Sequence, residues 1–216
     1  METKIPIAAG LVVVWLSIAT FGMPSPASAE WYVAGDVGVN FADRLTGISG
    51  TGDLTGVEPR SPDFDLKNSI SYGAKLGYFP EHSWFGIEGE VLQTTPHVKQ
   101  LDGVAPGIHL SLTTLGVNFL ARYPGRTFQP YIGIGPGMVI ARLSDSPANE
   151  IQSDTSATGG WNVLAGLRAF VTPYVAVFTE YKYTGATLRF DQAFGTGGFE
   201  GGYRAQHVLV GLSYHF

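Results

Sequence analysis

The chain ends in the stretch His207-Val208-Leu209-Val210-Gly211-Leu212-Ser213-Tyr214-His215-Phe216. Every second residue of this stretch is large and apolar, whereas the residues between them include polar and small ones. The apolar set is Val208, Val210, Leu212, Tyr214 and Phe216, and it opposes His207, Gly211, Ser213 and His215. Because side chains alternate between the two faces of a β-strand, this period of two predicts a strand whose faces meet different surroundings.

Seven earlier segments repeat the pattern, which gives eight predicted strands in all. The eight are Trp31–Phe41, Ile70–Phe79, Phe85–Gln93, Ile108–Tyr123, Phe128–Ala141, Gly160–Val171, Tyr174–Tyr183 and Ala205–Phe216. Pro136 interrupts the fifth segment, and proline cannot donate a ladder hydrogen bond, so we expect a kink or bulge there. After residue 29 the sequence holds no apolar run of about 18 residues, so no transmembrane helix is expected.

The segments between these strands alternate in length along the chain. The long ones are Ala42–Ser69, Thr94–Gly107, Arg142–Gly159 and Thr184–Arg204, and the short ones are Pro80–Trp84, Pro124–Thr127 and Thr172–Pro173. Short periplasmic turns and long outer loops alternate in this way in outer-membrane barrels with both termini inside. The loop pattern therefore favours an antiparallel up-and-down barrel over a soluble sandwich.

The two faces of the strands indicate which side of the barrel meets lipid. One face is apolar and has aromatic residues at the strand ends, while the other is rich in glycine and carries charges of both signs. These charges are Lys75, Glu88, Glu90, Arg122, Arg168, Glu180 and Lys182. A large apolar face outside and a small or charged face inside suit a lipid environment, in which the sheet has to close. We therefore predict an all-β fold, an eight-stranded antiparallel up-and-down transmembrane β-barrel, over residues 30–216.

Composition and the N-terminus fit this assignment. The 216 residues are 44% hydrophobic, contain no cysteine and carry a formal net charge of -5, which argues against disorder, thiol chemistry and nucleic-acid binding. Residues 1–29 combine Lys4, an apolar stretch and a final Ala27-Ser28-Ala29. This pattern predicts a cleaved signal peptide; an N-terminal membrane anchor is the alternative.

The chain resembles the small outer-membrane β-barrels of the OmpA transmembrane-domain type over all of residues 30–216. The matching pieces are His207–Phe216, Pro130-Tyr131-Ile132-Gly133-Ile134-Gly135 and Glu180-Tyr181-Lys182-Tyr183-Thr184. The resemblance implies a multi-pass protein of a Gram-negative-type outer membrane, in contact with lipopolysaccharide and delivered by periplasmic chaperones. It also implies that Tyr214 and Phe216 form a signal for the barrel-assembly machinery. We expect a monomer that requires no cofactor and binds no nucleic acid.

The inward charges are expected to form a salt-bridged network, because a buried charge is costly unless it is paired. Neighbouring strands would bring Lys75 to Glu88 or Glu90, Arg168 to Glu180, and Lys182 to His207 or Ser213. The network either fills and closes a narrow barrel or forms a gate on an ion path. We favour the first interpretation, in which the network fills and closes the barrel.

Outside these inward charges, the sequence offers few candidates for a catalytic or metal-binding site. His109 and Ser111 share a strand face and resemble the His-x-Ser pair of lipid A deacylase barrels, although no orienting carboxylate is evident beside them. Asp53, Glu58, Asp63 and Asp65 gather in the first long loop without the spacing of a calcium site, so we expect no metal.

Three functions follow as alternatives. The first and favoured one is a structural or surface-interaction barrel with four outer loops and a plugged lumen, and no enzymatic activity. The second is a narrow, porin-like transport barrel for ions or small apolar solutes. The third is a lipid A-modifying hydrolase that uses His109 and Ser111.

Overall fold

The computed structural model describes residues 30–42, 46–52, 68–81, 83–95, 109–144, 155–194 and 197–216. The predicted signal peptide, the acidic residues of the first long loop, and most of the second and third predicted loops lie outside these residues. No helix in the described part of the chain is long and apolar enough to cross a membrane.

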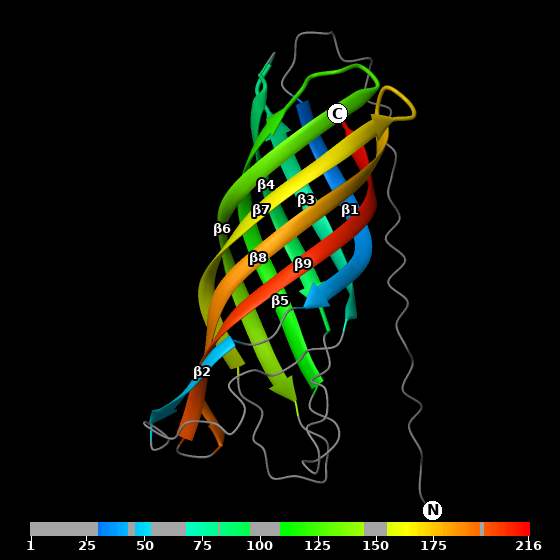
Figure 1. The fold of residues 1–216 in the computed structure, drawn as a ribbon. Helices are drawn as coiled ribbons and strands as arrows, with labels where there is room; N and C mark the ends of the chain where they lie inside the picture. Colours follow the sequence, from blue (N-terminus) through cyan, green and yellow to red (C-terminus); the bar gives the residue numbers. More distant parts are fainter. Residues whose placement is uncertain are drawn as a thin grey trace, which may run out of the picture.

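The described chain forms nine antiparallel strands (Figure 1). They are β1 (Glu30–Ala42), β2 (Thr46–Gly52), β3 (Ser69–Phe79), β4 (Phe85–Thr94), β5 (His109–Arg122), β6 (Phe128–Ser144), β7 (Thr155–Phe170), β8 (Val175–Phe194) and β9 (Gly197–His215). Apart from β2, each strand pairs with the next one along the chain, and β1 pairs with β9 to close the sheet. The predicted eight-stranded antiparallel barrel is therefore confirmed, with β2 as an addition outside the closed set.

The alternation along β9 shows that the apolar face points outward. Val210 and Leu212 are 52% and 60% exposed, whereas Leu209 and Ser213 are at most 1% exposed. An outer surface of this kind is unsuited to water but suited to hydrocarbon, in which strands have to pair their backbone groups with those of their neighbours. The predicted orientation of the faces is confirmed.

The prediction of a fourth long loop over Thr184–Arg204 is wrong. Strands β8 and β9 continue as a hairpin through almost all of it, pairing from Thr184↔Ala205 to Phe194↔Gly197 with an irregularity after Phe190. Part of the first predicted loop is also a strand, because β2 pairs with the extended part of β9. The hairpin and β2 project beyond the barrel at the end opposite the short turns (Figure 1). Frequent glycines and mixed polar residues hide the period of two in this region.

Of the kink or bulge predicted at Pro136, the bulge is wrong, because neither strand pairing of β6 shifts its register there. Within β5 and β6 the Cα pairing pauses at Val117 and Asn118, and it resumes in the same register at Phe119↔Ile134. Proline lacks the amide hydrogen for this ladder, so the pairing has a local gap without any shift of the strand.

The connections β3–β4, β5–β6 and β7–β8 are short turns, as predicted. They lie at the same end of the barrel as Phe216. The β7–β8 turn is fixed by Thr172, whose hydroxyl accepts a hydrogen bond from the Val175 amide at 2.9 Å. Aromatic side chains surround the barrel at this end, in pairs such as Trp31–Tyr78 and Trp84–Tyr123, with ring centroids 4.7 and 5.8 Å apart. A belt of this kind is typical of a membrane interface.

Candidate functional site

The candidate site is the lumen, whose inward side chains form layers along the barrel. The first layer, beside the short turns, is polar. Glu30 lies between Arg122 and His215, with its two oxygens 2.5 Å from Arg122 Nη1 and 2.6 Å from His215 Nδ1. The His215 ring is in turn hydrogen-bonded to Ser213 at 2.8 Å. This layer ties the first and last residues of the barrel wall to β5.

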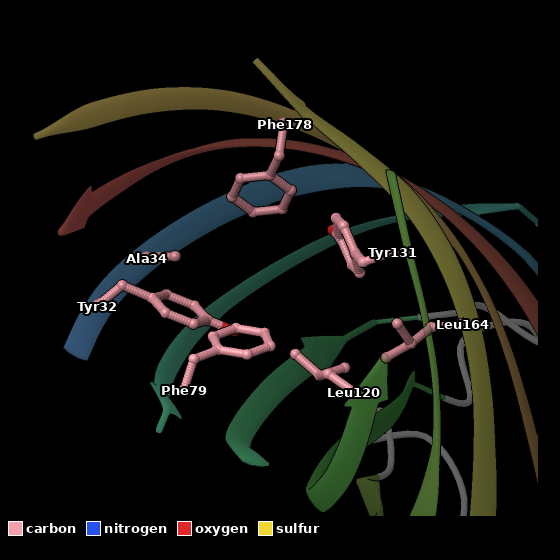
Figure 2. Close-up of a cluster of buried hydrophobic side chains, with 7 residues drawn as sticks. All are labelled: Tyr32, Ala34, Phe79, Leu120, Tyr131, Leu164 and Phe178. Carbon is pink, nitrogen blue, oxygen red and sulfur yellow. The ribbon is translucent and has the colours of Figure 1, made fainter. Parts of the chain in front are cut away.

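The second layer is an apolar cluster of large side chains (Figure 2). It consists of Tyr32, Ala34, Phe79, Leu120, Tyr131, Leu164 and Phe178, all of them at most 9% exposed. An eight-stranded barrel has an interior that side chains just fill, so these rings and isobutyl groups occupy the cross-section. They come from six different strands, which means that the cluster joins the wall from side to side.

Glycines on neighbouring strands make room for these large side chains. Phe178 lies directly opposite Gly211, and an added Cβ at Gly211 would be 2.6 Å from the Phe178 ring. Likewise, a Cβ at Gly133 would be 2.5 Å from Leu120. Both distances are far below van der Waals contact, so any larger residue there would have to displace the cluster. The glycine-rich inner face is therefore the counterpart of the aromatic cluster.

Two arginines cover the rings of this cluster. The Arg168 guanidinium lies 4.3 Å from the Tyr32 ring centroid and 5.3 Å from that of Tyr131. Arg122 lies 3.7 Å from the Phe79 ring centroid. Cation–π contacts of this kind are favourable when the cation is shielded from water, as it is here.

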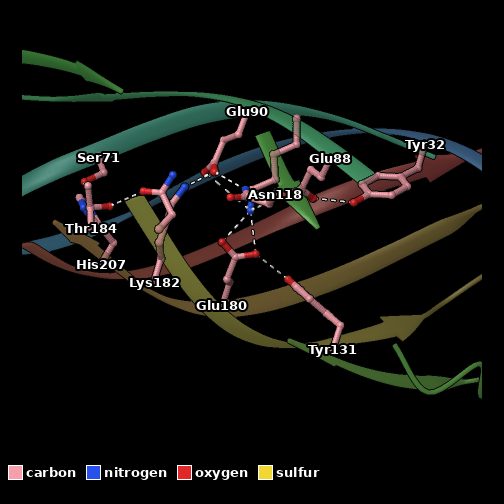
Figure 3. Close-up of polar contacts among 12 residues, drawn as sticks. Tyr32, Ser71, Glu88, Glu90, Asn118, Tyr131, Glu180, Lys182, Thr184 and His207 are labelled. Atoms are coloured by element: carbon pink, nitrogen blue, oxygen red, sulfur yellow. Dashed lines mark hydrogen bonds and ion pairs between the residues drawn. The ribbon is translucent and has the colours of Figure 1, made fainter. Parts of the chain in front are cut away.

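The third layer, at mid-lumen, holds the buried charges (Figure 3). Lys75 Nζ lies 2.7 Å from Glu180 Oε1, 3.6 Å from Glu88 and 3.8 Å from Glu90. Lys182 forms an ion pair with Glu90. Each of these five side chains is at most 1% exposed, so the charges depend on one another for compensation.

Neutral groups complete this charged layer and link it to the aromatic one. The Tyr32 hydroxyl donates to Glu88 at 2.5 Å, and the Tyr131 hydroxyl donates to Glu180 at 2.8 Å. The Asn118 amide donates to Glu88 and Glu90 at 3.4 and 3.3 Å. Each glutamate therefore accepts a hydrogen bond in addition to its contact with a lysine.

The ion pairs differ in part from those expected of neighbouring strands. Lys75 lies near Glu88 and Glu90 as expected, but its shortest contact crosses the lumen to Glu180. Lys182 lies opposite His207 in the register, yet its ion pair also crosses the lumen, to Glu90. Arg168 reaches Glu180 only through the Tyr131 ring, so the expected direct pair is replaced by a cation–π contact and a hydrogen bond.

Asp36 is a member of the charged layer that the sequence reasoning missed. It is 5% exposed, and neither of its carboxylate oxygens has a hydrogen-bond partner among the described residues. Its carboxylate lies over Gly73, within reach of the fields of Lys75 and Lys182. The alternation along β1 indicated that Asp36 points inward, because it stands an even number of residues from Tyr32 and Asn40, which also point inward.

Beyond the charges, toward the long hairpin, the lumen is lined by neutral polar groups. The Thr184 hydroxyl donates to Asn162 Oδ1 at 3.0 Å, and Ser71 lies 3.4 Å from both Thr94 and the His207 ring (Figure 3).

Ser111 does not lie in the lumen. It is on the outer face of β5, where its hydroxyl accepts a hydrogen bond from Gln93 Nε2 at 2.7 Å. The backbone of His109 pairs with Ser144, and the side chain of His109 lies outside the described part of the structure. Among the described residues, no three His, Asp or Glu side chains gather as metal ligands would.

Tyr214 and Phe216 lie on the outer face at the short-turn end, 47% and 53% exposed, with ring centroids 6.1 Å apart. The backbone of Phe216 exchanges hydrogen bonds with Trp31 at 2.9 and 3.1 Å. These contacts place the C-terminus at the seam where the barrel closes. The assembly-signal role of the two residues stays a prediction.

Comparisons with known proteins agree with this architecture. A protein of Brucella abortus is 24% identical over 202 residues, which cover 74% of this chain and 69% of that protein. The crystal structure of the outer membrane protein OprG from Pseudomonas aeruginosa has a TM-score of 0.63 at 16% identity, covering 88% of this chain and 97% of OprG. Neisserial surface protein A has a TM-score of 0.56 at 14% identity, covering 87% of this chain and 99% of its own.

These likenesses confirm the predicted resemblance to small eight-stranded outer-membrane barrels. The family model for the outer membrane protein β-barrel domain matches residues 13–216, which include every strand of the barrel. The chain belongs to the outer membrane protein β-barrel domain family.

Proposed function

We propose that this protein is a sealed outer-membrane barrel that holds an interaction surface at the end opposite its short turns. The family places it in the bacterial outer membrane. The observation that carries the proposal is the pair of consecutive layers that fill the lumen: the aromatic cluster and, beyond it, the ion-pair cluster. A barrel filled in this way serves as a rigid support rather than as a passage.

The two layers block different kinds of solute. An ion that crosses the aromatic cluster has to leave water in an apolar cross-section, which is costly. An apolar solute that crosses the mid-lumen has to separate Lys75 from Glu180, which would break the shortest contact of Lys75 in a site shielded from water. The geometry therefore supports the structural role over the transport role for either class of solute.

The surface part of the proposal rests on the projecting hairpin. Strands β8 and β9 extend beyond the barrel and add β2 as a third strand, which gives the loop end an ordered platform. Binding residues are commonly found on segments held by a rigid scaffold. The similar Neisserial protein is named a surface protein, and this name agrees with such a role.

Bilayer conductance tests the seal. We expect purified wild-type protein in a planar bilayer to show no stable conductance steps. Phe178→Ala, which removes a ring from the aromatic cluster, should allow brief openings if that layer is the barrier. Val177→Ala on the outer face of the same strand is the control and should stay closed. Steady conductance by the wild type would contradict the sealed barrel.

Cysteine labelling on intact cells tests whether the projecting hairpin and β2 are exposed at the cell surface. The chain has no native cysteine, so Ser49→Cys on β2 and Thr127→Cys in the β5–β6 turn give single thiols at exposed positions. A membrane-impermeant maleimide should label Ser49→Cys on intact cells, and Thr127→Cys only after permeabilisation. The reverse pattern would mean that the hairpin faces the periplasm.

The proposal gives Ser111 no catalytic role; its hydroxyl accepts a hydrogen bond from Gln93 on the outer face. Mass spectrometry of lipid A from cells with and without the protein should give the same acylation pattern. Loss of an acyl chain that depends on Ser111 would establish the hydrolase instead.

A further inference from the structure

The outer wall of the barrel is not uniformly covered by large side chains. A groove of about 650 Å³ lies across β3–β6, with Ala74, Gly89, Val91, Leu115, Val117 and Met138 among its lining residues. Its depth comes from small residues: an added Cβ at Gly89 would meet only the Leu76 carbonyl, at 4.0 Å. Gly116 and Gly137, which lie opposite each other on β5 and β6, line it with their backbone only, since an added Cβ at either would lie 2.9 Å from Asn162 in the lumen.

The groove opens toward the bilayer, because the large residues around it are among the exposed apolar ones. Val91 is 47% and Val117 45% exposed on the lipid-facing side. An empty groove beside hydrocarbon would forfeit dispersion contacts that a flexible chain can supply. Its volume falls within the range of about 300–1,000 Å³ typical of ligand sites. The apolar half of its occupant is therefore an acyl chain.

A polar group stands at one end of this groove on the same outer face. Gln93, two residues beyond Val91 on β4, donates to Ser111 at 2.7 Å and accepts from Thr113 at 2.6 Å. These three side chains are only half-buried, so they can also contact a molecule outside the barrel. Four residues of strand separate Gln93 from Gly89, or about 13 Å at about 3.3 Å per residue.

A positive charge completes this polar end. Arg142 on β6 lies directly opposite Ser111 in the register, and it is exposed on the outer face. It stands four residues beyond Met138, as Gln93 stands four residues beyond Gly89. A guanidinium beside hydroxyl and amide donors is a typical partner for a phosphate.

We infer that the outer wall over β3–β6 binds one phosphate-bearing acyl lipid of the surrounding leaflet. Its acyl chain lies in the groove, and its phosphate and ester region contacts Arg142, Ser111 and Gln93. The site lies on the outer face of the barrel, and its lining includes Lys75 and Glu90, whose side chains belong to the charged layer of the lumen. It would anchor one lipid at a fixed place on the wall opposite β8 and β9.

Native mass spectrometry of the full-length protein, extracted from membranes in a mild detergent, tests this site. Wild-type protein should retain one phosphate-bearing acyl lipid, identified after extraction. Gly89→Leu should lower retention at least about fivefold, because the leucine side chain would project into the groove from a position where an added Cβ meets only the Leu76 carbonyl, at 4.0 Å. Arg142→Gln should lower it about tenfold through loss of the charged contact.

Val210→Phe is the matched control, because it adds bulk to the lipid face of β9 on the opposite side of the barrel. It should retain lipid like the wild type, and heat-modifiable mobility on a gel should show that all variants fold. Equal retention by Gly89→Leu and wild type, or no lipid on the wild type, would overturn the site. Retention of neutral lipid alone would overturn the assigned phosphate contact.

Discussion

The aromatic and charged layers of the lumen lie next to each other but are assembled in different ways. Phe178 packs against a glycine on the adjacent strand, so its contacts are set by strand neighbours. The ion pairs Lys75–Glu180 and Lys182–Glu90 instead connect strands on different sides of the barrel. The first layer therefore depends on local register, and the second on the closed shape of the whole sheet.

Removal of the Phe178 ring is the strongest test of the aromatic layer. Phe178→Ala should lower the free energy of unfolding by about 3–5 kcal/mol, because the lost contacts leave a cavity that strand neighbours cannot refill. Urea unfolding in detergent micelles measures this change. A loss below about 1 kcal/mol would mean that the cluster is loosely packed.

Removal of Glu180 tests the charged layer. Glu180→Ala leaves Lys75 without its 2.7 Å partner, and should cost of order 3 kcal/mol of unfolding free energy. Glu180→Gln keeps an acceptor for the Tyr131 hydroxyl and should cost less. An unfolding midpoint equal to that of the wild type would show that Glu180 is solvated.

The hydroxyl of Tyr131 links the two layers, and its removal should have a smaller effect. Tyr131→Phe keeps the ring in the aromatic cluster but deletes the hydrogen bond to Glu180, at a cost of about 1–2 kcal/mol. Tyr72→Phe on the outer face, where Tyr72 is 55% exposed, is the control and should be neutral. Equal effects in the two variants would argue against a coupling between the layers.

The smallest effect is expected at Asp36. Asp36→Asn replaces a buried carboxylate that has no hydrogen-bond partner among the described residues. Because the removed charge lacks direct compensation, the free energy of unfolding should change by less than about 1 kcal/mol, or rise. A loss as large as that of Glu180→Ala would show that Asp36 is an essential counter-ion for Lys75 or Lys182.

The sequence was sufficient to predict on which face of the sheet each side chain lies. The alternation along each strand correctly separated lipid-facing residues such as Leu212 from inward residues such as Lys182. It could not predict Lys75–Glu180, because those residues are 105 positions apart and meet only through the shear of a closed barrel. The extension of β8 and β9 was missed because the glycines after Thr184 dilute the period of two.

Asp36 and Tyr131 show a second limit of sequence reasoning. Both have the correct inward parity, but whether an inward polar group finds a partner depends on side-chain reach across the lumen. The lipid groove was missed for a related reason, since Ala74, Gly89 and Leu115 come from three strands whose alignment the sequence does not reveal.

The closure of β1 on β9 also has a consequence for folding kinetics. The pairing Tyr32↔His215 joins residues at almost opposite ends of the 187-residue segment that follows the predicted signal peptide. Contacts of such high sequence separation slow folding, because the entropy of loop closure is lost before the contacts form. The barrel therefore cannot close until synthesis has reached its last residues, and the unpaired edge of β1 has to be kept from aggregation during that interval.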